Sequence, residues 1–173
     1  MREQKGTDIS EGKPREYCGV IGISKHKEAA EMAYLGLYSL QHRGQESAGI
    51  VSTDGDSVYR HVGRGLVNDV FSEEAIRKLK GRAAIGHNRY STTGSDSEMN
   101  VQPLLVNTKD GALALGHNGN LVNSRVIRSM LQQEGALFQS TTDSELIVHL
   151  IARSQKKTLT DKVKEALQQI KGA

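Results

Sequence analysis

The sequence predicts an α+β fold, built from layers of strands and helices and not from a doubly wound parallel sheet. The predicted strands come in groups, the predicted helices come in groups, and few βαβ alternations occur. An Asp-Gly pair between two β-prone runs predicts a hairpin, which joins antiparallel strands. At 173 residues the chain is long enough for one domain with its own core and too short to expect two.

Short apolar runs bounded by polar or turn residues predict the strands. The predicted strands cover residues 18–24, 48–52, 58–62, 83–86, 104–107 and 112–115. The second and third flank Asp54-Gly55-Asp56, which is typical of a hairpin turn. Residues 41–47 form a polar break, and residues 90–98, rich in Ser, Thr, Gly and Asp, predict a loop.

Apolar side chains at helical spacing predict the helices, and capping residues mark their ends. A loose helical face covers residues 28–40, and Ser72 precedes a short helix as its N-cap. Another helix runs from Ser124 to about residue 134, where Gly135 ends it. Asp143 or Ser144 is expected to cap the next helix, and the last helix is expected to begin at Thr160.

Composition and charge argue against several classes of protein. The net charge of +3 is small and mixed in sign, and Lys156-Lys157 is the only dense basic spot, so no nucleic-acid binding is predicted. No apolar run approaches the roughly 18 residues of a membrane-spanning helix, so no membrane partner is predicted. The single cysteine cannot build an internal disulfide, a Cys-rich zinc site or an iron–sulfur cluster alone, which favours a reducing, cytoplasmic setting.

Polar motifs beside the predicted strands are the candidates for a functional site. Taken singly, each has an ordinary explanation. Cys18 can be a small buried hydrophobe, Asn118-Gly119 a tight turn, and Asp143 a helix cap. Arg89 can be a surface cation. The histidines have spacings that match no standard zinc pattern, so no metal site is predicted.

Five motifs together resemble the glutaminase domain of class II amidotransferases, which are N-terminal nucleophile hydrolases. They occur in that family's order and spacing from Cys18 to the end of the chain. Leu-Gln-His-Arg-Gly-Gln-Glu in the second motif is similar to the phosphoribosylpyrophosphate amidotransferases within this group. The motifs are Cys18-Gly-Val-Ile-Gly-Ile23, Leu40-Gln-His-Arg-Gly-Gln-Glu-Ser-Ala-Gly-Ile50, Gly86-His-Asn-Arg-Tyr-Ser-Thr-Thr-Gly94, His117-Asn-Gly-Asn-Leu121 and Thr142-Asp-Ser-Glu-Leu146.

The resemblance implies that Cys18 is the nucleophile. A free thiol has a pKa of about 8.5, so it needs a base beside it at neutral pH. If Cys18 is the first residue, its own α-amine, with an ordinary pKa of about 7.7–8.0, can serve as that base and no catalytic histidine is needed. While Tyr17 is attached, this nitrogen is an amide. We therefore expect residues 1–17, a polar stretch without a secretory signal, to be a disordered propeptide.

The other site residues are implied by the resemblance alone. Asn118 and Gly119 are expected to form the oxyanion hole, through a side-chain amide and a backbone N–H. Arg43 is expected to orient the terminal cysteine. Arg89 is expected to bind the glutamine α-carboxylate and Asp143 the α-ammonium group.

The resemblance also implies a four-layer αββα sandwich of two antiparallel sheets, cut short at its C-terminal end. Full-length relatives add a phosphoribosyltransferase domain that receives the ammonia to make 5-phosphoribosylamine for purine synthesis. For that full-length enzyme, Mg²⁺, a 4Fe–4S cluster in some members and a homo-oligomer are expected, with no cofactor in residues 18–173. Two alternatives remain open: a non-catalytic or unprocessed glutamine-binding module, and the glutaminase domain of another class II amidotransferase.

Overall fold

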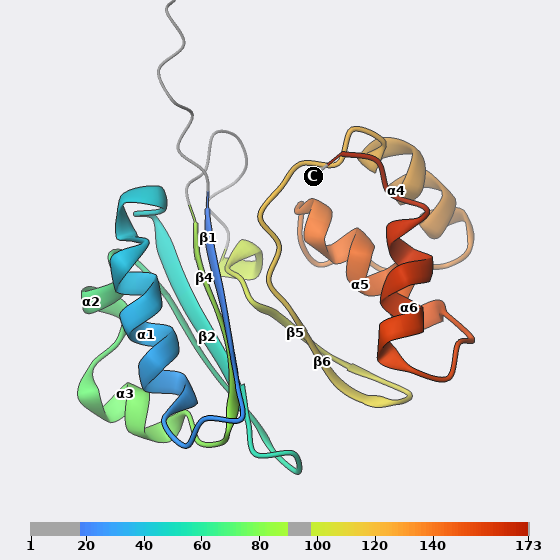
Figure 1. The fold of residues 1–173 in the computed structure, drawn as a ribbon. Coiled ribbons are helices and arrows are strands. Elements are labelled where there is room, and N and C mark those ends of the chain that lie inside the picture. The colour runs from blue at the N-terminus through green and yellow to red at the C-terminus, as the bar shows by residue number, and fades with distance from the viewer. Residues whose placement is uncertain (1–17, 90–97, 173) are drawn as a thin grey trace, which may run out of the picture.

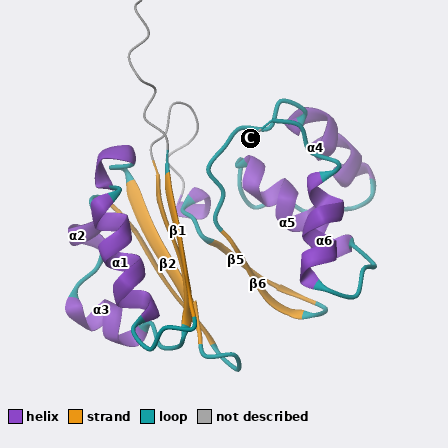
Figure 2. Ribbon diagram, in the orientation of Figure 1, coloured by secondary structure: helices purple, strands orange, loops and turns teal. Residues whose placement is uncertain are grey.

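The computed structural model describes residues 18–89 and 98–172. They form four layers, in which two antiparallel sheets lie between two groups of helices (Figures 1 and 2). This arrangement confirms the predicted α+β class and the αββα sandwich. The expected extension at residues 1–17 and most of the expected loop at 90–98 lie outside the described residues. The last residue of that loop, Glu98, begins a 3-10 helix, η2 Glu98–Asn100.

The larger sheet has four strands in the order β1-β4-β2-β3, all antiparallel. They are β1 Gly19–Ser24, β2 Ser47–Thr53, β3 Val58–Arg64 and β4 Ala83–Arg89. The predicted hairpin joins β2 to β3, and its turn is closed by Asp54 Oδ1, which accepts hydrogen bonds from the N–H groups of Asp56 and Ser57. Strand β4 runs three residues beyond the prediction, because it is paired on both sides.

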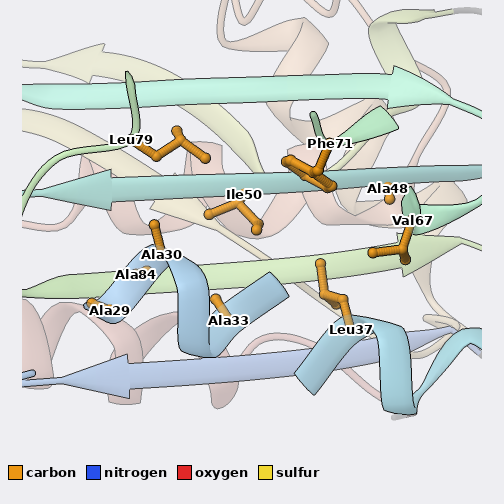
Figure 3. Close-up of a cluster of buried hydrophobic side chains, with 10 residues drawn as sticks. All are labelled: Ala29, Ala30, Ala33, Leu37, Ala48, Ile50, Val67, Phe71, Leu79 and Ala84. Carbon is orange, nitrogen blue, oxygen red and sulfur yellow. The ribbon is translucent and has the colours of Figure 1, made fainter. Parts of the chain in front are cut away.

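Helices cover the outer face of this sheet. They are α1 Ala29–Ser39, α2 Val67–Val70 and α3 Glu73–Lys78. In α1 the buried residues Ala29, Ala30, Ala33 and Leu37 share one face and pack on Ile50 and Ala84 of the sheet (Figure 3). The predicted cap of α3 is confirmed, since Ser72 Oγ accepts a hydrogen bond from the Ala75 N–H. The single turn α2 was not predicted, because four residues show no helical period.

The second sheet and helical layer follow in the chain. The sheet pairs β5 Leu104–Thr108 with β6 Gly111–Leu115, as predicted. Helices α4 Ser124–Gln133, α5 Asp143–Arg153 and α6 Leu159–Leu167 pack together around Leu131, Leu146 and Leu150. Gly135, with a φ of +87°, ends α4 as expected.

Two predicted helix starts are wrong by one or two residues. Helix α5 takes Thr142 as its N-cap residue, and Asp143 is its first helical residue, whose carboxylate accepts a hydrogen bond from the Leu121 N–H. Helix α6 begins at Leu159 after Thr158, whose hydroxyl accepts from the Asp161 N–H, and not at Thr160. Neighbouring capping residues compete in both sequences, and tertiary contacts decide between them.

The segment before β5 packs directly on the larger sheet. A Cβ atom on Gly49 of β2 would lie 2.2 Å from the carbonyl oxygen of Gln102, so only glycine permits this approach. Arg60 of β3 donates hydrogen bonds to the carbonyls of Val101 and Pro103. These contacts bring Gln102 against the face of β4 that lies opposite α1.

Candidate active site

Cys18 lies half-buried at the start of β1, the point where several predicted site residues meet. The N–H of the next residue, Gly19, donates to Asn88 Oδ1 at 2.7 Å. Asn88 is fully buried on β4, and its own amide donates to the carbonyl of Leu40 at 2.9 Å. The backbone beside the cysteine is therefore tied to both β4 and the end of α1.

Two predicted catalytic side chains contact the main chain of Cys18. Asn118 Nδ2 donates to the Cys18 carbonyl oxygen at 2.8 Å, and Arg43 Nε donates to the same oxygen at 3.4 Å. Arg43 comes from a short 3-10 helix, η1 Gln41–Arg43, inside the predicted polar break. Asn118 follows β6, a hundred residues further along the chain than Cys18. The fold thus brings three segments distant in sequence onto one peptide group.

Gly119 follows Asn118 in an exposed stretch of chain. Within the described part of the chain its N–H donates to no protein acceptor. A primary amide carries two N–H groups, and one of those on Asn118 is used by the Cys18 carbonyl. The second amide N–H of Asn118 and the N–H of the next residue, Gly119, are therefore two donors that can serve an oxygen bearing negative charge.

The two predicted substrate-binding charges stand at the ends of different elements. Arg89 is the last residue of β4, directly after Asn88, and is half-buried. Asp143 opens α5, and its hydrogen bond from the Leu121 N–H, 2.8 Å long, ties it to the chain just after Asn118. Among residues 18–89 and 98–172, neither side chain forms an ion pair, and no hydrogen bond joins Arg89 to Cys18, Asn118 or Asp143. Their charges are thus unneutralised by any described residue.

His117, which precedes the two donors, is held at three atoms. Its N–H donates to Gln102 Oε1 at 2.8 Å, and its carbonyl accepts from His87 Nε2 at 3.2 Å. Its Nδ1 lies 3.3 Å from Ser144 Oγ, in the first turn of α5. Burial lowers the pKa of His117 below the ordinary value, and the charge of Asp143 opposes this in part.

His87 is fully buried on β4, and this burial lowers its pKa to about 4, with the nearby Arg89 adding to the effect. The ring is therefore neutral at pH 7. Because a carbonyl only accepts, the neutral ring must carry its proton on Nε2 to bond the carbonyl of His117. The other nitrogen, Nδ1, is buried and has no hydrogen-bond partner among the described residues.

The depressed pKa of His87 predicts that the chain loses stability in acid. The unfolded histidine has a pKa of about 6.5, so below that pH the unfolded state binds more protons than the folded state. The free energy of unfolding should fall between about pH 6.5 and pH 4, by about 3 kcal/mol in total from this group. Urea unfolding at pH 7, 5 and 4 measures the loss. A His87→Gln variant should show a smaller loss over the same range, and an equal loss would contradict the assignment.

Sequence reasoning missed three residues that shape the site. Asn88 and His87 follow the predicted strand 83–86 within a polar motif and were given no structural or catalytic role, yet they are buried in the central part of the sheet. Gln102 lies just before the predicted strand 104–107 and belongs to none of the five motifs. The available signal was the odd–even alternation in β4, which sends Asn88 towards α1 and His87 to the opposite face.

Comparison with known proteins gives consistent results. Residues 87–173 match the model of a glutamine amidotransferase domain. The chain is 50% identical over 159 residues to an amidophosphoribosyltransferase of Bacillus subtilis, covering 91% of this chain and 33% of that protein. It is 45% identical over 168 residues to the chloroplastic amidophosphoribosyltransferase 3 of Arabidopsis thaliana, covering 96% and 32%.

Comparison with solved structures also finds similar enzymes. A structure of the allosteric regulatory enzyme of purine biosynthesis matches with a TM-score of 0.85 at 50% identity, covering 89% of this chain and 33% of that one. The glutamine phosphoribosylpyrophosphate amidotransferase of B. subtilis, complexed with ADP and GMP, matches with a TM-score of 0.83 at 49% identity, covering 88% and 33%. The chain spans about a third of the length of the curated relatives it matches.

Proposed function

Because the chain belongs to the family of glutamine amidotransferase domains, we propose that it hydrolyses glutamine to glutamate and ammonia, with Cys18 as nucleophile. The observation that carries this proposal is the meeting of Arg43 and Asn118 on the Cys18 carbonyl. A cysteine kept only to fill the core would not require two polar side chains, from segments far apart in sequence, on its own peptide group.

The chemistry needs the α-amine of Cys18 to be free. The amine takes the thiol proton, the sulfur attacks the side-chain carbonyl carbon of glutamine, and the proton passes to the departing nitrogen, which leaves as ammonia. Water then hydrolyses the γ-glutamyl thioester to glutamate and restores the thiol. Arg43 and Asn118 hold the carbonyl of the same residue, so they limit the rotation of the amine and thiol around it.

Charge that develops on the substrate carbonyl oxygen is stabilised by the Asn118 amide and the Gly119 N–H. Both lie in exposed chain beside Cys18, and no described residue uses the Gly119 N–H. Asn118 can serve both purposes, because one N–H holds the Cys18 carbonyl while the other remains for the oxyanion.

Arg89 and Asp143 select free glutamine. A guanidinium pairs with a carboxylate through two parallel hydrogen bonds, and a carboxylate binds an ammonium group. Neither side chain is neutralised within the described residues, which leaves both charges for the substrate. A glutamine inside a peptide lacks both charged groups and would be rejected.

For the full-length protein we propose the activity named for the relatives, the transfer of this ammonia to phosphoribosylpyrophosphate to give 5-phosphoribosylamine in purine biosynthesis. The acceptor domain and a homo-oligomer belong to this proposal, as does a cytoplasmic location. No helix within residues 18–89 and 98–172 is long and apolar enough to cross a membrane. Among the same described residues, no group of three or more His, Cys, Asp or Glu could hold a metal ion.

The test compares two forms of the chain. The form that begins at Cys18 should release glutamate and ammonia from glutamine, whereas the form that keeps residues 1–17 should not. Isothermal titration calorimetry with glutamine measures whether each form binds glutamine. Equal rates from the two forms would refute the α-amine as base. A folded chain beginning at Cys18 that binds glutamine without hydrolysing it would favour the non-catalytic module.

Arg89→Lys should weaken glutamine binding more than it slows the chemical step. One ammonium group cannot reproduce the paired geometry of the guanidinium, so KM should rise about tenfold with kcat within about threefold. Steady-state kinetics with glutamine measure both constants. Arg125→Lys on the exposed side of α4 is the matched control and should change neither. A fall in kcat at constant KM would contradict the assigned role.

A further inference from the structure

We propose that His87 is a positioning residue for the oxyanion hole, which it holds in place, together with Gln102, through the backbone of His117. The inference rests on the proposed glutaminase function and extends it to two residues that have no part in the chemical steps proposed above. Both residues lie outside the set predicted from the sequence.

Hydrogen bonds hold both the N–H and the carbonyl of His117. Gln102 Oε1 accepts from the N–H of His117 at 2.8 Å, and His87 Nε2 donates to its carbonyl at 3.2 Å. The carbonyl of His117 belongs to the same planar peptide group as the N–H of Asn118. A fixed carbonyl therefore fixes the direction in which the chain enters Asn118 and Gly119.

The two side chains come from firmly held parts of the fold. His87 lies on β4, which is paired with β1 and β2 on its two sides. Gln102 is buried, in a segment whose own carbonyl packs against Gly49. By contrast, Asn118 and Gly119 lie in an exposed stretch outside any helix or strand, so they depend on such anchors for their position.

Packing alone does not explain a histidine at position 87. The ring is fully buried and leaves Nδ1 without a partner among the described residues, which costs free energy that an apolar side chain of similar volume would avoid. What the histidine provides is one donor, at Nε2, aimed at the His117 carbonyl. We therefore attribute the histidine at position 87 to its hydrogen bond with the His117 carbonyl, which positions residues 117–120.

The experiment uses the chain beginning at Cys18, the form in which wild-type activity is measured. His87→Leu removes the donor, and His87→Gln keeps an N–H near the position of Nε2. With His87→Leu, kcat should fall about 10–100-fold, somewhat less than for loss of a donor itself, while the KM for glutamine stays within about threefold. His87→Gln should recover at least half of the lost activity on a logarithmic scale.

His61→Leu is the matched control. His61 Nε2 also donates to a backbone carbonyl, that of Val70 at 2.8 Å, but it lies on the edge strand β3. Its loss should lower the melting temperature and leave kcat unchanged. Gln102→Met removes the other anchor and should reproduce the selective loss of kcat.

Hydrogen exchange separates this inference from the proposed function. In His87→Leu, amide exchange at residues 117–120 should accelerate while exchange in β1 and β4 stays slow. This readout holds even if wild-type chain proves inactive, which would refute the glutaminase function alone. Unchanged exchange at 117–120, a kcat within twofold of wild type, or failure of both His87→Leu and Gln102→Met to fold would each overturn the positioning role.

Discussion

Cys18→Ala is expected to abolish glutamate release while leaving the fold intact. Position 18 supplies the only thiol in the chain, and alanine offers no nucleophile to form the thioester. The rate should fall by about 10⁴-fold or more, to the detection limit, as is typical for loss of a covalent nucleophile. The fold should persist, because the contacts from Asn118 and Arg43 are made to the carbonyl of residue 18 and those of Asn88 to the next residue. A coupled glutamate assay and thermal unfolding measure the two effects.

Two further variants test whether the loss of activity is specific to the thiol of Cys18. Cys18→Ser keeps a weaker nucleophile of similar shape and should retain at most a trace of activity. Ser24→Ala, at the exposed far end of β1, should be as active as wild type. Isothermal titration with glutamine should show binding to Cys18→Ala close to that of wild type. Measurable turnover by Cys18→Ala would require another nucleophile and would refute the proposal.

The parts of the fold that follow from local pattern were predictable. Each of the six predicted strands is present, since short apolar runs between turn signals are a local property. The Asp-Gly turn and the end of α4 at Gly135 were correct for the same reason. The stacking of the two sheets came from resemblance alone, because the contacts that define it, such as that of Gly49 with Gln102, join residues far apart in sequence.

In the candidate site too, some residues could be identified from the sequence and others could not. Side chains proposed to carry the chemistry, such as those of Cys18 and Asn118, were identified from the resemblance of their motifs, and the fold brings the Asn118 amide onto the Cys18 carbonyl. Their supports were not identified. Asn88 and His87 lie just beyond the predicted strand 83–86, and their burial depends on pairing with two other strands, which no local pattern contains. The capping role expected for Asp143 was also wrong: one oxygen of its carboxylate, Oδ2, accepts a hydrogen bond from a distant backbone N–H, that of Leu121, and the N-cap residue is Thr142.

Asn118→Asp is expected to reduce kcat by about 10²–10³-fold with little change in the KM for glutamine. The substitution keeps the size of the side chain but replaces the amide donors with a carboxylate, which repels the negative charge that develops on the substrate. It also removes the hydrogen bond to the Cys18 carbonyl, so the loss should exceed that of His87→Leu. KM should stay nearly constant, because in the proposed mechanism Arg89 and Asp143 bind the other end of the substrate.

Single-turnover kinetics can locate the effect of Asn118→Asp. Both formation and hydrolysis of the thioester pass through an oxyanion, so the variant should slow both steps. Asn107→Asp, on the exposed face of β5, makes the same chemical change away from the cysteine and should leave kcat unaltered. If Asn118 served only to anchor the Cys18 carbonyl, Arg43 would still hold that oxygen, and the loss should stay below about tenfold. A loss of two orders of magnitude or more therefore distinguishes stabilisation of the oxyanion from orientation of the cysteine.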